Sequence, residues 1–140
     1  MPLAGTQRPL TFAAQAAGLA HSSKGKAMSH LIRLDRDHIT PEIERPAPEK
    51  LLAGDPVHTT WNLEDRDGLY CGLWQSTPGK WRVAYEEWEY VHILEGVSIL
   101  TDSAGTATTL RAGDSFVIRP GFEGTWECVE TTLKDYVIRL

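Results

Sequence analysis

The sequence has few cysteines, no long apolar run and no concentration of basic charge, and each absence excludes a class of protein. Its 140 residues contain two cysteines, Cys71 and Cys128, which are too few for a disulfide-stapled secreted scaffold and match no zinc-module spacing. We therefore expect reduced thiols and a cytoplasmic protein. The longest uncharged, mostly apolar stretch, Pro9 to Ser23, is interrupted by polar residues and falls short of the roughly 20 residues that a membrane-spanning helix needs.

Basic charge is scarce in the part of the chain that is expected to fold. Residues 1–34 carry four basic residues and no acidic one, whereas residues 35–140 carry ten basic and nineteen acidic residues, for a net charge of −5 overall. An acidic domain without a basic stripe lacks the electrostatic footprint that nucleic-acid phosphates or anionic lipids require. We expect neither nucleic acid nor membrane as a partner.

Composition divides the chain into three segments. Residues 1–34 are rich in Ala, Gly and Ser without apolar periodicity, which is typical of a flexible leader. Residues 35–56 contain four prolines among charges, and because proline fixes φ and removes a hydrogen-bond donor, this segment is predicted to be an extended arm. Residues 57–140 are predicted to form a single barrel domain, and the 41% hydrophobic content of the chain is enough for one core.

Short runs of aromatic and β-branched residues recur about every ten residues after residue 57, separated by Gly, Pro, Asp or Ser. This spacing predicts an antiparallel sandwich or barrel, with no strand-helix alternation that would indicate a parallel sheet. Asp102 to Gly105 is predicted to be a hairpin loop, with Gly105 at a positive φ. The predicted strands are Val57–Asn62, Leu69–Gln75, Lys80–Tyr85, Tyr90–Leu94, Val97–Thr101, Ala107–Leu110, Ser115–Ile118, Gly124–Val129 and Leu133–Arg139.

Two segments of the sequence resemble known signature motifs. Gly79 to Gly96, followed by Gly113 to Cys128, is similar to the two motifs of the cupin superfamily, which implies an all-β jelly-roll barrel of two antiparallel sheets around a ligand cavity. The run Gly124 to Glu127 and the later Lys134 resemble a group of small cupins. That group includes the (S)-ureidoglycine aminohydrolase cupin domain and the ethanolamine-utilisation cupin.

The ligand set of metal-dependent cupins is missing from the sequence. These cupins resemble one another in placing three His and one Glu around a cation. Their first-motif spacing, counted back from Glu89 or forward from Gly79, never falls on a histidine; the positions reached are Arg82, Val83, Ala84, Tyr85 and Glu87. The histidine position of the second motif, three residues beyond Gly121, is Gly124. Transition-metal sites need imidazoles, thiolates or several converging carboxylates, and only Glu89, joined at most by Glu87, remains. We therefore expect no metal and no other cofactor.

Strand alternation sorts the remaining histidines and the candidate interior residues. His92 falls on the face opposite to Glu89, and the other four histidines lie outside the motif strands, so we expect an interior without imidazole. The side chains that share the face of Glu89 are expected to be Trp81, Val83, Tyr85, Trp126 and Cys128.

Glu89 and Tyr85 are the candidate catalytic pair. A carboxylate among aromatic walls is costly to desolvate unless hydrogen bonds or a cation satisfy it. Tyr85 is expected to donate to Glu89, and Lys134 or Arg82 to supply the positive charge. A carboxyl group beside a phenol can move a proton on a bound ligand. In the alternative interpretation, Glu89 is a buried residue that holds the fold together.

The other candidate residues are assigned to ligand binding: Trp81, Val83, Glu87, Trp126, Cys128 and Lys134. Each has a structural alternative. The tryptophans can be core mass, Glu86 and Glu87 can be solvated in a turn beside Trp88, and Lys134 can be a solvated strand lysine. Cys128 has no sequence neighbour that would activate a thiolate, so we do not expect it to be a nucleophile.

The function expected from these residues is the binding of a small polar or amine-bearing metabolite in the barrel without a transition metal. Whether the protein is an enzyme stays open between acid-base catalysis by Glu89 and Tyr85 and a non-catalytic binding or accessory role. The missing ligands disfavour a third alternative, a metal-dependent aminohydrolase or oxygenase. Because edge strands invite pairing and the arm of residues 35–56 can lie on a neighbour's sheet, we expect a two-fold homodimer.

Overall fold

The structure is a computed structural model that describes residues 30–140. Residues 1–29 of the predicted leader therefore lie outside the described residues. Within residues 30–140 there is no helix, and the all-β prediction is confirmed. The strands are β1 (Glu42–Glu44), β2 (Leu51–Gly54), β3 (His58–Arg66), β4 (Leu69–Ser76), β5 (Gly79–Ala84), β6 (Trp88–Asp102), β7 (Ala107–Arg111), β8 (Ser115–Ile118) and β9 (Glu123–Arg139).

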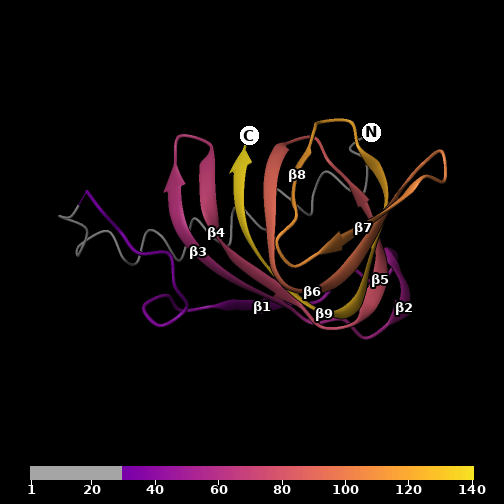
Figure 1. Ribbon diagram of the computed structural model, residues 1–140, viewed down its shortest axis with the longest axis horizontal. Coiled ribbons are helices and arrows are strands. Elements are labelled where there is room, and N and C mark those ends of the chain that lie inside the picture. Colours follow the sequence, from indigo (N-terminus) through magenta and orange to yellow (C-terminus); the bar gives the residue numbers. More distant parts are fainter. Residues whose placement is uncertain (1–29) are drawn as a thin grey trace.

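All the strands belong to one antiparallel sheet that curls into a barrel. Its hydrogen-bonded order is β1-β3-β4-β9-β5-β2, and β6 pairs with the other edge of β9 and with β7 and β8. β3 and β4 rise on one side of the barrel and β5 and β7 on the other, while β6 and β9 bend from one side to the other between them (Figure 1). The jelly-roll barrel predicted from the sequence is confirmed, and where the resemblance implies two antiparallel sheets, the strands form one sheet that curls.

The two long strands β6 and β9 are each continuous where the sequence predicts two separate strands. β6 joins the predicted Tyr90–Leu94 and Val97–Thr101, and β9 joins the predicted Gly124–Val129 and Leu133–Arg139. Their pairing register shifts repeatedly between Ile93 and Ser98. Bulges of this kind bend a strand without ending it, so a single ribbon forms parts of both barrel walls.

The inner face of the sheet carries the core, as the alternation of side chains predicts. Trp81 and Trp126 are directly opposite each other on β5 and β9 and are both fully buried. Val91 and Ile93 follow the inner face of β6 and are also fully buried. This face also holds the polar side chains of the candidate site, so the site lies in the core.

The arm of residues 35–56 contributes β1 and β2 to its own barrel. β1 pairs with β3, where Glu42 lies opposite Thr60, and β2 pairs with β5, where Leu51 lies opposite Trp81. The arm therefore lies on the sheet of its own chain. The predicted homodimer was based in part on the arm lying on the sheet of a neighbouring molecule. The structure removes that part of the argument, and the homodimer stays a prediction.

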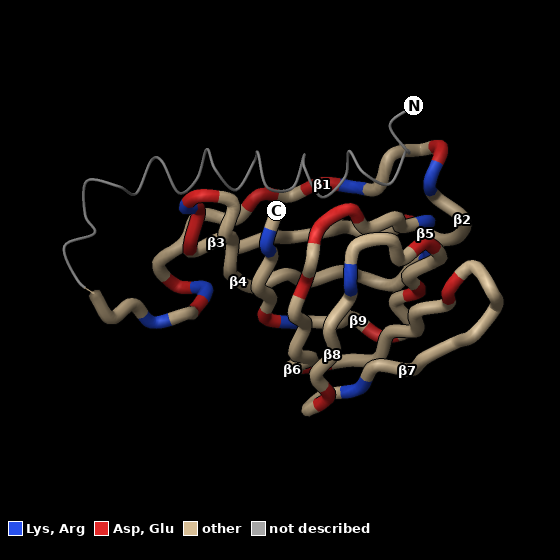
Figure 2. Tube along the Cα trace, turned by 90° about the horizontal axis from the view of Figure 1, so that it is seen from above, with Lys and Arg blue, Asp and Glu red and all other residues tan. Residues whose placement is uncertain are grey.

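The outer surface carries mixed charge. Figure 2 shows segments of Lys and Arg scattered among acidic ones along the chain. In the described part of the chain, no helix is long and apolar enough to cross a membrane.

Candidate functional site

A buried ion pair lies inside the barrel. Lys134 Nζ on β9 donates to Glu89 Oε2 on β6 at 2.7 Å, and both side chains are almost fully buried, at 6% and 4% exposed. The register of β6 and β9 sets this contact, because Lys134 lies opposite Ile93 and Glu89 lies opposite Ile138, on the same inner face. The prediction that Glu89 faces the interior is confirmed.

Of the two cations expected near Glu89, Lys134 supplies the contact. Arg82 lies on the opposite face of β5 from Trp81 and Val83, is exposed, and donates to the backbone oxygen of Glu49 at 3.4 Å. The side chain of Lys134 is 6% exposed, so the alternative of a solvated strand lysine is wrong.

Two indole rings flank the Lys134 ammonium group. Its Nζ lies 4.6 Å from the ring centroid of Trp74 and 4.6 Å from that of Trp126. The faces of indole rings attract cations, and more strongly where water is excluded. Trp74 lies directly opposite Lys134 on the neighbouring strand, and Trp126 stacks on Trp81 with an interplanar angle of 8°. One carboxylate and two indoles therefore surround this ammonium group, an arrangement we call the ammonium cage, formed by Glu89, Trp74 and Trp126.

His58 lies in the same interior, which corrects the expectation of an interior without imidazole. It is fully buried, and its ring centroid lies 4.5 Å from that of Trp81 and 5.1 Å from that of Trp74. On β3, His58 shares the buried face with Thr60 and Asn62. The inner positions of β3 are polar, so this strand lacks the apolar residues at every second position that usually mark an inner face. The sequence signal that could have placed His58 inside is that it stands two residues before Thr60 and four before Asn62 on the same strand.

The residues present do not fit a transition-metal centre. Among residues 30–140 no three His, Cys, Asp or Glu side chains converge on a point where they could hold a metal ion. Glu89 Oε2 instead accepts from an ammonium group that the chain itself supplies.

A second buried hydrogen bond lies on the same inner face. Tyr136 Oη on β9 donates to Asn62 Oδ1 on β3 at 2.6 Å, and Asn62 Nδ2 donates to the backbone oxygen of Glu64 at 2.7 Å. Burial raises the pKa of Tyr136 well above its ordinary value of 10, and the nearby Cys71 and Glu89 act in the same direction. The phenol is therefore held in its neutral, hydrogen-bond-donating form.

The protein is expected to lose stability in alkali through Tyr136. A group whose folded pKa is raised contributes stability that is fully present below its unfolded pKa of about 10 and is lost as the pH rises toward and through the folded pKa. Urea unfolding of Tyr136→Phe should show a deficit of about 1–2 kcal/mol at pH 7, because the bond to Asn62 is lost. The deficit should shrink by roughly 1.4 kcal/mol at pH 11. A deficit that is constant with pH would contradict this linkage.

A third polar group joins β6 and β9 beside the bulges. Trp126 Nε1 donates to Ser98 Oγ at 3.0 Å, and Ser98 Oγ contacts Thr132 Oγ1 at 2.7 Å. The Cys128 thiol donates to the backbone oxygen of Ser76 at 3.2 Å. Burial, the largest cause, raises the pKa of Cys128 above its ordinary 9. The thiol is therefore protonated at neutral pH, as expected of a cysteine that is not a nucleophile.

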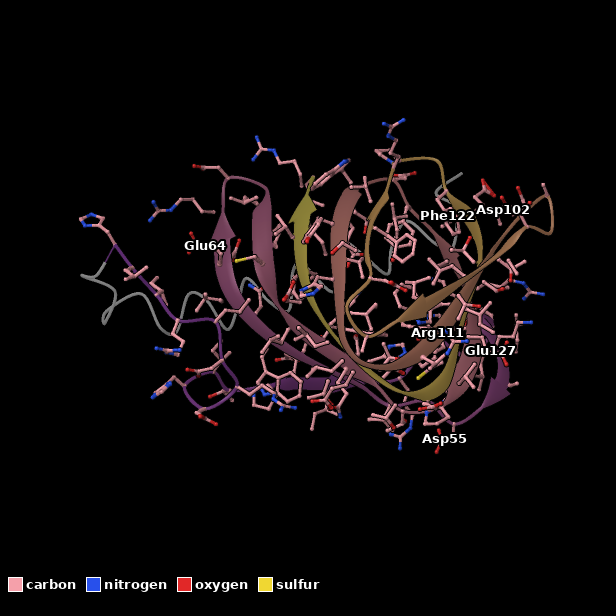
Figure 3. The ribbon with its side chains drawn as sticks, in the orientation of Figure 1. Asp55, Glu64, Asp102, Arg111, Phe122 and Glu127 are labelled. Atoms are coloured by element: carbon pink, nitrogen blue, oxygen red, sulfur yellow. The ribbon has the colours of Figure 1, made fainter. Side chains whose placement is uncertain are left out.

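Tyr85, Glu87 and Val83 are all buried near the end of β5. Tyr85 meets Phe122 edge to face at 6.1 Å, and in Figure 3 the Phe122 side chain lies near the upper end of the barrel, between β8 and β9. Glu87 is 4% exposed, so its expected solvation in a turn is wrong, whereas Glu86 is exposed. A contribution of Tyr85 to proton transfer at Glu89, and of Val83 and Glu87 to ligand binding, stays a prediction.

His92 lies on the outer face of β6, as its position in the strand predicts. Its Nδ1 lies 3.1 Å from Asp135 Oδ2, and the two side chains are 36% and 26% exposed. His92 thus forms a surface pair separate from the buried Glu89 and Lys134.

The sequence matches one family model, described as the EutQ-like cupin domain, over residues 63–136, which is more than half of the chain. No match to the chain is found among curated proteins.

Several solved structures resemble this fold. A DUF861-family protein of unknown function from Pseudomonas syringae pv. tomato has a TM-score of 0.66 and 26% identity, over 75% of this chain and 46% of that one. EutQ from Clostridium difficile has a TM-score of 0.55 and 16% identity, over 60% of this chain and 63% of that one. Ectoine synthase from P. lautus has a TM-score of 0.54 and 14% identity, over 59% and 63%. The chain spans about half the length of the first protein and less than two thirds of the other two.

Proposed function

Because the chain belongs to the EutQ-like cupin family, we propose that it binds a small polar or amine-bearing metabolite inside its barrel. Glu89 is the charged contact in this proposal, and no transition metal takes part. The observation that carries it is the burial of Glu89 at 3% exposed on the inner face, beside the Lys134 ammonium group, which two indole rings flank.

The energetics of a buried ion pair support a role other than stability. Removing two charges from water costs several kcal/mol per ion, and apolar side chains of similar volume often stabilise a core as well or better. The core around Glu89 is otherwise rich in large apolar groups, Trp81 and Trp126 among them. A stable barrel does not require a carboxylate here, whereas a site for a polar ligand needs a few polar groups that fix the orientation of the ligand.

The proposal has a catalytic and a non-catalytic form. In the catalytic form, Glu89 and Tyr85 act as base and acid on the bound metabolite, since a carboxylate and a phenol can accept and donate a proton. The non-catalytic form is favoured by the contact between Glu89 Oε2 and Lys134 Nζ at 2.7 Å, because a carboxylate oxygen that already accepts a hydrogen bond from an internal ammonium group is less available to take a proton from a ligand.

A charge-removing substitution tests the proposal. The Glu89→Gln variant keeps the size of the side chain, and binding is measured by calorimetry and thermal shift over a panel of amines, ureides and organic acids. Metabolites that bind the wild type should bind the variant at least about tenfold more weakly, because hydrogen bonds to charged groups contribute roughly 1.5–3 kcal/mol. Turnover of any bound metabolite then separates the catalytic form from the non-catalytic one.

The matched control is Glu127→Gln. Glu127 follows Trp126 on β9 and so lies on the opposite, outer face, near the edge of the barrel in Figure 3. This variant should bind every metabolite as the wild type does. Unchanged binding and turnover of all metabolites by Glu89→Gln would refute the proposal.

A further inference from the structure

The charges buried in the barrel limit which ligands can enter. Glu89 and Lys134 form a buried ion pair inside the barrel, with side chains 4% and 6% exposed. One is acidic and one is basic, so the pair carries no net charge. A ligand that adds net charge to this interior leaves a charge without compensation, and a low-dielectric interior penalises that heavily.

Ligands of a single charge would disrupt the contact between Glu89 and Lys134. A simple ammonium ion bound to Glu89 would displace Lys134 Nζ from a carboxylate that it contacts at 2.7 Å. A simple carboxylate bound to Lys134 would compete with Glu89 in the same way. Each exchange replaces one ion pair with another and leaves a buried charge separated from its partner.

A ligand with both charges avoids this separation. Its ammonium group can contact Glu89 while its carboxylate contacts Lys134, so one ion pair becomes two and the net charge does not change. Lysine suits this exchange, because its charge sits at the end of a flexible four-carbon stem. The indole faces of Trp74 and Trp126, both 4.6 Å from Lys134 Nζ, would then receive the ligand's ammonium group in its place.

We infer that the ligand class of this barrel is a small zwitterion with a primary ammonium group and a carboxylate, which inserts between Glu89 and Lys134. This inference rests on the proposed function and specifies its ligand. Within it, the ammonium cage recognises the ligand's cation and Lys134 its anion. Lys134 occupies the cage until a zwitterion arrives.

Three probes of similar size test the inference by calorimetry at constant ionic strength: propylammonium, propionate and β-alanine. The wild type should bind β-alanine at least tenfold more tightly than either singly charged probe. Glu89→Gln leaves the positive charge of Lys134 and should shift the preference to propionate. Lys134→Ala leaves the negative cage and should shift it to propylammonium, which replaces the atoms that the alanine variant lacks.

Thermal stability gives a readout that does not require a fully stable variant. Propylammonium should raise the melting temperature of Lys134→Ala and leave that of the wild type unchanged. If a variant does not fold even with its probe present, the order in which the wild type binds the three probes still decides the matter. Equal binding of the three probes, or of none of them, by the wild type would overturn the inference, and so would an unchanged order of preference in Glu89→Gln.

The outcomes separate this inference from the proposed function. If Glu89→Gln weakens binding of a neutral or singly charged metabolite while zwitterions have no advantage, the inference is wrong and the proposed function stands. If Glu89→Gln binds every ligand of the wild type with unchanged affinity, both the inference and the proposed function are wrong.

Discussion

Replacing Lys134 by methionine is expected to lower the free energy of unfolding by about 3–5 kcal/mol at pH 7. Methionine keeps most of the volume of the lysine stem, so the main change is electrostatic. Glu89 would remain in a core where its side chain is 4% exposed, without the ammonium group now 2.7 Å away. The variant also loses the attraction between that ammonium and the faces of Trp74 and Trp126. Urea unfolding followed by tryptophan fluorescence measures the difference.

A double-mutant cycle separates the ion pair from the packing. Glu89→Gln alone leaves Lys134 buried beside an uncharged group and should also be strongly destabilising. The double variant Glu89→Gln with Lys134→Met has no buried charge at either position and should be more stable than Lys134→Met alone, with a coupling energy of roughly 2 kcal/mol or more. Additive effects of the two substitutions would show that the two charges do not stabilise each other.

Replacing Gly96 by alanine is expected to destabilise the barrel by more than about 3 kcal/mol. Gly96 lies in the bulged part of β6 with φ of +88°, where side chains other than hydrogen are strained. A Cβ atom there would also lie 2.1 Å from the backbone oxygen of Thr131 on β9. Both strands would have to separate at the point where they bend together, so the loss includes packing as well as local strain.

Gly105→Ala is the matched control for this prediction. Gly105 has nearly the same φ, +89°, but lies in the loop after β6, where a Cβ atom meets nothing within 4 Å. Its substitution should cost only the left-handed strain of about 1–2 kcal/mol. Chemical unfolding of the two variants in parallel separates backbone strain from steric clash, and equal losses would refute the importance of the contact with Thr131.

The ends of the short strands could be predicted from the sequence, and the bends of the long strands could not. β8 has the predicted bounds, Ser115–Ile118, because Gly113 and Pro120 mark its ends. β6 was divided at Glu95 and Gly96, which resemble a turn in sequence but form a bulge within one strand. A glycine at positive φ is compatible with a turn and with a bulge, so only the pairing of β6 with β9 decides between them.

The candidate site was predictable where the inner face is apolar. Trp81, Val83, Trp126 and Cys128 are buried as strand alternation predicts. His58 was missed because the inner positions of β3 carry polar side chains, while Trp61 and Leu63 alternate with them on the other face. Likewise Glu87, next to a turn, is buried by contacts that only the tertiary structure supplies. Polarity predicts burial poorly where a core contains charged side chains that pair with each other, as Glu89 and Lys134 do.

The pairing of the arm with the barrel has a consequence for association between molecules. β1 and β2 cover the edges of β3 and β5, and both precede residue 63, where the match to the family model begins. A barrel without them would present two rows of unpaired backbone donors and acceptors, which invite aggregation through strand addition. The arm replaces these two edges by short ones, three residues in β1 and four in β2. Its prolines and charged side chains make it a poor template for the strands of another molecule.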